Sequence, residues 1–199
     1  MIAKRIFDLL LSVPGLVILL PLFVMLAIWI KLDSPGPVLF RQLRVGLHGK
    51  AFRVLKFRTM RADAEKSGPS VTVSADSRIT GSGKVLRKYK LDELPQLINV
   101  IRGEMSLVGP RPEVPEYVAY YSEAEKAKIF SVPPGITDLA SIEYRDESDL
   151  LSESDDPLKT YVEQIMPAKL AYYNSYVERR SMWLDIKIIL RTLKVIVSH

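Results

Sequence analysis

A long apolar stretch near the start of the chain is its strongest pattern. Between Asp8 and Lys31, 22 consecutive residues carry no charge and leave no polar face. As a helix they would extend about 33 Å, which is enough to cross the hydrocarbon core of a bilayer. No small-residue cleavage site follows the stretch, so we interpret it as a retained membrane segment rather than a signal peptide.

Two prolines interrupt this stretch and leave two topologies open. Pro14 precedes Gly15, and Pro21 lies near the middle. An interior proline removes a backbone hydrogen bond and kinks or breaks a helix. A break at Pro21 predicts a re-entrant segment over residues 1–32 that returns to the face it entered, and basic residues on both flanks agree with this. A spanning helix that tolerates its prolines is the alternative, and the pattern alone favours neither.

Short apolar runs after the stretch predict a small β-hairpin. Residues 33–37 (DSPGP) form a turn that ends the apolar segment. Val38–Phe40 and Ala51–Leu55 are the expected strands, and Leu47–Lys50 is the expected turn between them. Residues 62–82 are rich in Ser, Gly and Asp, which is typical of a mobile loop.

Apolar positions spaced three and four residues apart predict helices over most of the remainder. The expected helices are Lys84–Lys90, a segment from Leu94 that Gly103 ends, Glu116–Phe130, Pro157–Val177 and Met182–Val197. In the last of these, basic residues lie beside an apolar stripe, so it suits an anionic membrane surface and the protein's own core equally. The predicted fold class is therefore mainly α with a small β-hairpin, behind an N-terminal membrane helix.

Composition limits the chemistry that these elements can carry. The chain of 199 residues has no cysteine and two histidines, which excludes disulfides, thiolate metal sites and cysteine nucleophiles. The net charge is +5, but residues 1–111 carry 18 Lys/Arg against 8 Asp/Glu, and residues 112–199 carry 10 against 15. A basic front half indicates a polyanionic partner. Nucleic acid is a weak candidate, because the basic residues are not interleaved with aromatic ones and no binding motif is present.

The segment Lys90–Leu97 (KLDELPQL) carries the candidate chemistry. Its adjacent carboxylates, Asp92 and Glu93, have an ordinary explanation as a helix cap and a dipole-favoured glutamate, which spacing alone favours. The surrounding cations favour a phosphate site instead; they are Lys56, Arg58, Arg87, Lys88, Lys90 and Arg111. Such cations would keep Asp92 ionised and nucleophilic, and one of the two carboxylates could hold a divalent cation such as Mg²⁺.

Seven segments in one order resemble a known family. They are K-R-I-F-D at Lys4–Asp8, the apolar run with its prolines, F-R-Q-L-R-V-G at Phe40–Gly46, K-F-R-T-M at Lys56–Met60, L-D-E-L-P-Q-L-I-N-V at Leu91–Val100, G-E-M-S-L-V-G-P-R-P at Gly103–Pro112, and P-G-I-T at Pro134–Thr137. Over nearly its whole length the chain resembles the bacterial sugar transferases, the small monotopic polyprenyl-phosphate phosphoglycosyl transferases.

The resemblance implies an enzyme that transfers a phosphosugar from a UDP-sugar to polyprenyl phosphate. In the family pattern Asp92 attacks the β-phosphorus, releases UMP and carries the phosphosugar covalently until polyprenyl phosphate accepts it. Glu93 is the expected Mg²⁺ ligand beside Asp92. Lys56, Arg87 and Arg111 match positions that are expected to contact phosphates.

The same resemblance favours the re-entrant topology. It implies a monotopic protein of the bacterial inner membrane, with Pro21 at the membrane break, interfacial amphipathic helices, and a catalytic domain over residues 33–199 that faces the cytoplasm. Leu20 stands where the family often has serine, so a serine hydroxyl cannot stabilise the bend here. A non-catalytic scaffold that binds anionic lipid headgroups is the alternative function, and the oligomeric state, a homo-oligomer included, stays open.

The sugar end of the expected site departs from the family. Relatives often continue P-G-I-T with Gly-Trp, whereas Asp138 follows Thr137 here. Candidate sugar- or nucleotide-binding residues are Thr137, Asp138, Glu143 and Arg145. A surface position is an equal alternative for Arg145. The expected sugar, an N-acetylated amino sugar on UDP, is implied by the family alone.

Overall fold

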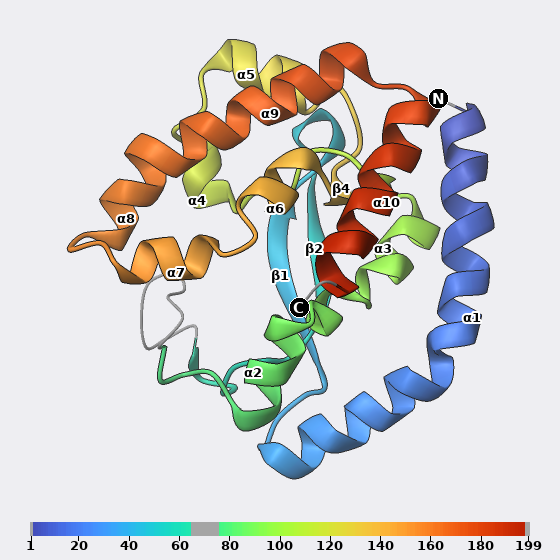
Figure 1. The fold of residues 1–199 in the computed structure, drawn as a ribbon, viewed down its shortest axis with the longest axis vertical. Coiled ribbons are helices and arrows are strands. Elements are labelled where there is room, and N and C mark those ends of the chain that lie inside the picture. The colour runs from blue at the N-terminus through green and yellow to red at the C-terminus, as the bar shows by residue number, and fades with distance from the viewer. Residues whose placement is uncertain (1, 65–75, 198–199) are drawn as a thin grey trace.

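The computed structural model describes residues 2–64 and 76–197, so the predicted loop over 62–82 lies partly outside the described residues. The helices are α1 (Ile2–Asp33), α2 (Gly81–Lys88), α3 (Gln96–Arg102), α4 (Pro115–Val118), α5 (Glu123–Ile129), α6 (Leu139–Glu143), α7 (Glu147–Ser152), α8 (Pro157–Thr160), α9 (Met166–Arg179) and α10 (Met182–Val197). The strands are β1 (Leu39–Val45), β2 (Ala51–Phe57), β3 (Ser106–Val108) and β4 (Gly135–Thr137). Three single turns are η1 (Leu47–Gly49), η3 (Leu91–Glu93) and η4 (Tyr161–Ile165). The mainly helical fold with a small sheet is confirmed (Figure 1).

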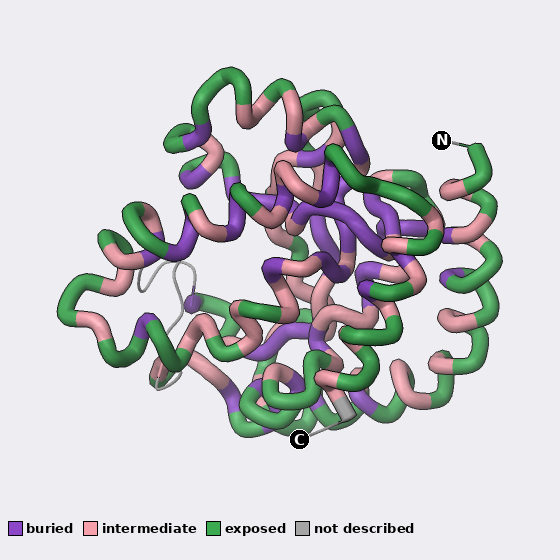
Figure 2. The backbone as a smooth tube through the Cα atoms, turned by 45° about the horizontal axis from the view of Figure 1, so that its top comes forward, coloured by how far each residue is buried: buried purple, intermediate pink, exposed green. Residues whose placement is uncertain are grey.

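α1 is one continuous helix that runs through both Pro14 and Pro21. Figures 1 and 2 show it bending between two straighter halves. The helix is therefore bent rather than broken: each proline lacks the N–H that would bond the carbonyl four residues earlier, and the helix continues past it. Within the part of the chain that the structure describes, α1 is the one helix long and apolar enough to cross a membrane.

The polarity of α1 is inverted relative to a helix in water. Its first half buries Asp8 and Ser12, and its second half buries Leu26 and Ile30. The large apolar side chains that it exposes are Ile2, Ile6, Leu10, Leu11, Val13, Val17, Ile18, Leu20, Val24, Met25, Ile28, Trp29 and Leu32. An exposed apolar surface of this extent marks contact with a partner or with lipid. In the first half of α1, the face that meets the protein is therefore polar, whereas in the second half it is apolar.

Both ends of α1 bind the same folded unit. Near its start, Lys4 Nζ lies 2.6 Å from a carboxylate oxygen of Asp185 in α10. One turn later, Asp8 accepts a hydrogen bond from the backbone N–H of Leu107 in β3. At the other end, Asp33 accepts a hydrogen bond of 2.8 Å from the Ser82 hydroxyl in α2. The bend therefore returns the helix to the domain from which it starts.

A β-hairpin and a short parallel pair form the two sheets. β1 and β2 pair in antiparallel register, with Leu39 opposite Phe57, which confirms the predicted hairpin. β3 and β4 pair in parallel and were not predicted, because they join segments distant in sequence. The two segments approach so closely that a Cβ on Gly135 would lie 2.1 Å from the backbone nitrogen of Gly109. Only glycine fits there, and this contact fixes the Gly-Pro-Arg-Pro loop beside P-G-I-T.

Several helices differ from the predicted ones. The helix expected over Glu116–Phe130 is divided into α4 and α5, because Ser122 starts α5 with a capping box to Glu125. The acidic segment over 138–156 contains α6 and α7, which were not predicted. The long helix from residue 157 forms as α8 and α9, joined by the wider π-type turn η4. Pro167 just beyond η4 has no N–H for the ordinary helical bond, which explains the wider turn.

One face of α10 packs against the core, which bears out one of its two alternatives, whereas the membrane-surface position stays a prediction. Ile188 is fully buried against the cluster that contains Val108 and Tyr176. On another face it exposes the large apolar residues Trp183, Leu190 and Leu193. Figure 2 shows the same contrast across the molecule, with buried residues gathered at the centre and α1 largely exposed at the edge.

Candidate active site

One cleft brings together most of the predicted site residues. It has a volume of about 1810 Å³ and lies between the β1–β2 hairpin, α2, and the segment that carries α6 and α7. The predicted residues that line it are Lys56, Arg58, Arg87, Asp92, Glu93, Arg111, Thr137 and Arg145. Asp138 and Glu143 lie outside its lining.

Asp92 and Glu93 lie in η3, just before α3. The chain enters this turn through Lys90, whose φ of 54° is left-handed and strained for a residue with a side chain. Asp92 does not cap α3, because Pro95 occupies the cap position. Instead the Asp92 side chain is buried, and its Oδ1 has no hydrogen-bond partner. A buried carboxylate oxygen with no partner is uncommon, and it fits a group that binds a ligand.

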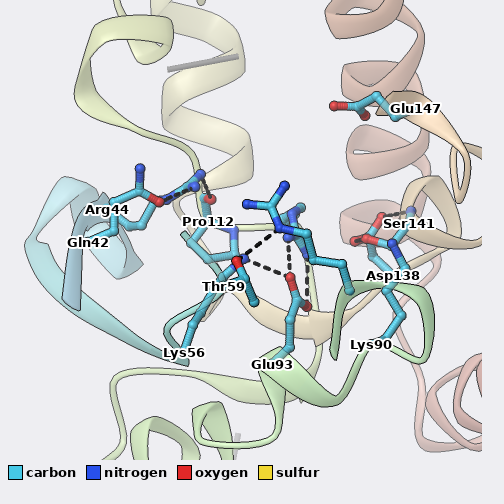
Figure 3. A network of polar contacts seen from close by, with 12 residues as sticks. Gln42, Arg44, Lys56, Thr59, Lys90, Glu93, Pro112, Asp138, Ser141 and Glu147 are labelled. Carbon is cyan, nitrogen blue, oxygen red and sulfur yellow. Dashed lines mark hydrogen bonds and ion pairs between the residues drawn. The ribbon is translucent and has the colours of Figure 1, made fainter. Parts of the chain in front are cut away.

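Glu93 is held by two cations (Figure 3). Lys56 Nζ lies 2.8 Å from Glu93 Oε1, and Arg111 donates to both carboxylate oxygens, at 3.2 Å to Oε2. Burial alone would raise the pKa of Glu93, but the charges of Arg111 and Lys56 outweigh burial and hold that pKa well below its usual range. The same contact raises the pKa of Arg111 well above its usual range. Glu93 is therefore held in its ionised form.

Asp92 has the opposite electrostatic setting. Burial raises its pKa, the charge of Glu93 raises it further, and Lys56 and Arg87 counteract the rise only in part. The cations do lower the pKa of Asp92, as expected, but burial and Glu93 outweigh them, and an ionised Asp92 stays a prediction. Burial is the largest cause of the rise, and Lys56 and Arg111 bond to Glu93 rather than to Asp92. An additional cation beside Asp92 would favour its ionised form.

Arg87 and Arg58, both expected to contact phosphates, have different settings. Arg87 on α2 lines the cleft, and its Nε donates to the Thr59 hydroxyl at 2.9 Å, which leaves its terminal nitrogens outside that bond. The Arg58 guanidinium donates instead to acceptors at the end of α1 and just beyond it; these are the carbonyls of Ile30, Ser34, Pro35 and Pro37 and the Ser34 hydroxyl. Its donors are taken by the backbone, so the structure gives Arg58 a structural position in place of the expected phosphate contact.

The side chains of Thr137 and Asp138 form hydrogen bonds within the protein. The Thr137 hydroxyl shares a hydrogen bond of 2.7 Å with Thr192 of α10. Asp138 is almost fully buried and caps α6, where it accepts hydrogen bonds from the backbone and hydroxyl of Ser141. Burial raises the pKa of Asp138 against these bonds. Thr137 can still reach the cleft, whereas Asp138 serves the helix that follows it.

Glu143 and Arg145 differ in their position relative to the cleft. Glu143 is exposed and forms an ion pair of 3.1 Å with Arg191 of α10, away from the cleft. Arg145 lines the cleft, but its guanidinium donates to the carbonyl of Val195. The Arg145 carbonyl in turn accepts from Lys90 at 3.4 Å, which ties the loop before the carboxylate pair to the segment between α6 and α7.

A second polar group in the same cleft was not predicted from the sequence. Tyr161 donates to Glu113 at 2.6 Å, and Arg44 lies 3.3 Å from the other oxygen of that carboxylate. Lys169 pairs with Glu147 at 2.8 Å and stands 5.2 Å above the Tyr161 ring. These residues come from five separate segments, so no local pattern connects them. The one sequence signal was a carboxylate directly after Gly-Pro-Arg-Pro.

Asp92 and Glu93 are the best candidates for a metal site. No group of three or more carboxylates or histidines gathers among residues 2–64 and 76–197. Mg²⁺ is commonly held by one or two carboxylates, with substrate phosphates and water completing its coordination. The unpartnered Oδ1 of Asp92 would supply one oxygen ligand, and Glu93 is adjacent. This donor set fits Mg²⁺ bound together with a phosphorylated substrate.

A buried carboxylate pair in a cation-lined cleft defines the class: an enzyme for phosphate-bearing substrates, here joined to a helix that could anchor it in a membrane. Transfer of such groups depends on positioning and charge neutralisation more than on acid–base residues, which agrees with the absence of cysteine and the scarcity of histidine. The chain matches the bacterial sugar transferase family over residues 1–199 and belongs to that family.

Three relatives show the range of the family. A UDP-glucose:undecaprenyl-phosphate glucose-1-phosphate transferase of Caulobacter vibrioides is 39% identical, covering 96% of this chain and 68% of the relative. A UDP-N-acetylgalactosamine-undecaprenyl-phosphate N-acetylgalactosaminephosphotransferase of Aeromonas hydrophila is 36% identical, over 98% of this chain and 44% of the relative. The exopolysaccharide production protein PSS of Rhizobium leguminosarum bv. phaseoli is 40% identical, and the match covers 97% of this chain and 94% of the relative. The chain thus spans about two thirds of the first relative and less than half of the second.

Proposed function

We propose that this protein transfers a phosphosugar from a UDP-sugar to polyprenyl phosphate, releasing UMP and forming a polyprenyl diphosphate sugar, the first membrane step of bacterial glycan assembly. The observation that carries the proposal is the buried, unpartnered oxygen of Asp92 beside the ion-paired Glu93. The names of two relatives, which pair UDP-sugars with undecaprenyl phosphate, support these substrate classes. The alternative of a non-catalytic lipid-binding scaffold is not favoured.

The reaction proceeds in two displacements at one phosphorus atom. A carboxylate oxygen of Asp92 attacks the β-phosphorus of the UDP-sugar, an Asp92–phosphorus bond forms, and the bridging bond to the α-phosphate breaks, so UMP leaves with the bridging oxygen. An oxygen of polyprenyl phosphate then attacks the same phosphorus. The Asp92–phosphorus bond breaks, and the phosphosugar leaves on the lipid as a diphosphate. Asp92 returns to its starting carboxylate.

The cleft residues around Asp92 neutralise the phosphates and hold them in place. Lys56 and Arg111 fix the Glu93 carboxylate and add positive charge next to the attacking oxygen. Arg87 on α2 has guanidinium nitrogens beyond its bond to Thr59 with which to bind a phosphate. Asp92 and Glu93 would hold Mg²⁺, which supplies the charge that stabilises the ionised Asp92 and screens the substrate phosphates.

The apolar helix α1 inserts into the cytoplasmic leaflet of the inner membrane and returns to the same face, with Pro21 near its turning point. This part of the proposal is supported by the attachment of both ends of α1 to one folded unit, through Lys4 to Asp185 and through Asp33 to Ser82. A straight spanning helix would place these ends on opposite sides of the bilayer. The exposed apolar residues of α10 lie at the interface beside it. The catalytic domain then faces the cytoplasm, where UDP-sugars are present.

A UMP-release assay with polyprenyl phosphate and Mg²⁺ in detergent tests the reaction. Asp92→Asn is expected to lower the rate at least about 10³-fold, because amide oxygen is a poor nucleophile. Asp155→Asn, which changes an exposed aspartate, is the matched control and retains the wild-type rate. Mass spectrometry without acceptor is expected to find a phosphosugar on Asp92. Retained turnover in Asp92→Asn, or an adduct trapped on another residue, would contradict the two-step scheme.

Site-directed labelling tests the topology. A tag at Met1 and a second tag after residue 33 are both expected to react only with a reagent that has access to the cytoplasmic side. Labelling of the Met1 tag from outside the cell would show a spanning helix. That result would overturn the re-entrant topology and leave the proposed reaction standing.

A further inference from the structure

The cleft has two walls of opposite charge. The cationic wall consists of α2 and its flanking segments; its basic lining residues are Arg61, Arg78, Lys84, Arg87, Lys88 and Lys90. The acidic wall is the segment over 138–149, whose charged lining residues are Arg145, Asp146, Glu147 and Asp149. Phosphates favour the first wall, and the carboxylates of the second wall can accept hydrogen bonds from the hydroxyls of an uncharged sugar.

Glu147 of the acidic wall and Lys169 of α9 form an ion pair that offers both hydrogen-bond acceptors and donors. Lys169 is 6% exposed, and its Nζ lies 2.8 Å from Glu147 Oε2. The side chain of Glu147 keeps 27% of its surface exposed and lines the cleft, so the pair is open on one side. In Figure 3 the Glu147 carboxylate stands across from the Glu93 network and is directed back toward it.

A network of largely buried side chains contacts this pair through Lys169. The Lys169 ammonium stands 5.2 Å above the ring of Tyr161, and the Tyr161 hydroxyl donates to Glu113, which also pairs with Arg44. Tyr161 is carried by the π-type turn η4, a backbone feature that is frequent at functional sites. The network joins the β1–β2 hairpin to α9, so it restricts the movement of Lys169.

Resting on the proposed function, we propose that Glu147 and Lys169 bind the donor sugar, with the carboxylate accepting from one ring hydroxyl and the ammonium donating to a neighbouring one. The sugar this pair selects is an uncharged hexose or N-acetylhexosamine. The acids around the pair, Asp146 and Asp149, repel the carboxylate of a uronic acid sugar. The UMP half of the donor lies outside this contact, toward the cationic wall.

Kinetics with Glu147→Gln and Lys169→Met test the assignment. Five donors are compared in the UMP-release assay: UDP-glucose, UDP-galactose, UDP-N-acetylglucosamine, UDP-N-acetylgalactosamine and UDP-glucuronate. For the neutral donor that wild type uses best, each variant is expected to raise KM about tenfold, the value of one charged hydrogen bond. Inhibition by UMP, which lacks the sugar, is expected to stay within about twofold of wild type.

Matched controls separate this role from a structural one. The control variants are Glu153→Gln, just after α7, and Lys159→Met in α8. Both side chains are exposed and lie outside the cleft lining, so KM is expected to stay at its wild-type value. An unchanged KM in both cleft variants overturns the assignment. So does a parallel rise of KM and of the UMP inhibition constant, or a wild-type preference for UDP-glucuronate. Absence of UMP release from any donor by wild type overturns the proposed function itself.

Discussion

The floor of the cleft, as we call the position of Glu93 and the cations that bond to it, and the outer surface of the segment over 138–149 use the same residue types in different ways. At the floor, Glu93 is bonded by Lys56 and Arg111, and all three side chains are largely buried. On the outer surface of the segment over 138–149, Glu143 forms an ion pair with Arg191 in solvent. Breaking a buried pair leaves an uncompensated charge, whereas an exposed pair is worth little. Burial, rather than the presence of opposite charges, determines which pairs matter.

Arg111→Met is expected to have the largest effect, because it removes two bonds from the buried Glu93. We expect the free energy of unfolding to fall by about 3 kcal/mol and the rate of UMP release to fall about 100-fold. The depressed pKa of Glu93 adds stability above its unfolded-state pKa, and this is lost as pH falls through the folded-state pKa. In the variant that pKa rises, so acid unfolding in detergent begins at higher pH.

Arg102→Met is the control for this variant, because Arg102 is exposed at the end of α3. It is expected to change the free energy of unfolding by no more than about 0.5 kcal/mol. An equal loss in both variants would contradict the contrast between floor and surface.

Arg58→Met is expected to have the next largest effect, on stability and not on substrate binding. It removes the donor that satisfies the carbonyls at the end of α1, so the free energy of unfolding falls by about 2 kcal/mol. KM for the UDP-sugar stays within about twofold. Arg53→Met, in an exposed position of β2, is the control in thermal unfolding. A raised KM with unchanged stability would restore Arg58 to the phosphate ligands.

Asp92→Asn is expected to stabilise the fold while it abolishes activity. The pKa of Asp92 is raised in the folded state, so its charge costs stability at pH above that pKa and costs none at pH below its unfolded-state value. In EDTA at pH 7 the variant is expected to unfold about 1 kcal/mol less readily than wild type. The difference disappears as pH falls through the folded-state pKa. A variant less stable than wild type at pH 7 would contradict this electrostatic account.

Glu143→Gln is expected to have the smallest effect. Its partner Arg191 is exposed, so the pair contributes no more than about 0.5 kcal/mol, and added salt reduces even this. Rate and KM stay at wild-type values for every UDP-sugar. A donor-specific rise in KM would return Glu143 to the sugar-binding residues and weaken the contrast between the two regions.

Local signals in the sequence were sufficient for part of the fold. Turn residues around Leu47–Lys50 and the short apolar runs beside them predicted the hairpin, and Gly103 correctly marked the end of α3. The 3–4 spacing also located α10 correctly, although it did not show which apolar face meets the core. The carboxylate pair in its cation-rich surroundings was likewise visible from the order of residues.

Contacts between distant segments could not be predicted in this way. The parallel pairing of β3 with β4 depends on two glycines whose backbones touch, and neither segment reads as a strand by itself. The pairing of Lys169 with Glu147 depends on the fold bringing α9 against α7. The pKa shifts of Asp92 and Glu93 depend on which of the two carboxylates Lys56 and Arg111 contact. The number of charges in the sequence does not reveal this.

The polar face of α1 has a consequence for biosynthesis. Its partners are made long after it: Arg5 donates to the carbonyls of Val100 and Ile101, and Lys4 pairs with Asp185. The helix therefore leaves the ribosome with its polar face unmatched, and the last match forms only when α10 is complete. The first turns of α1 are therefore completed only by α10, because a chain truncated before α10 leaves Lys4 without its ion-pair partner Asp185.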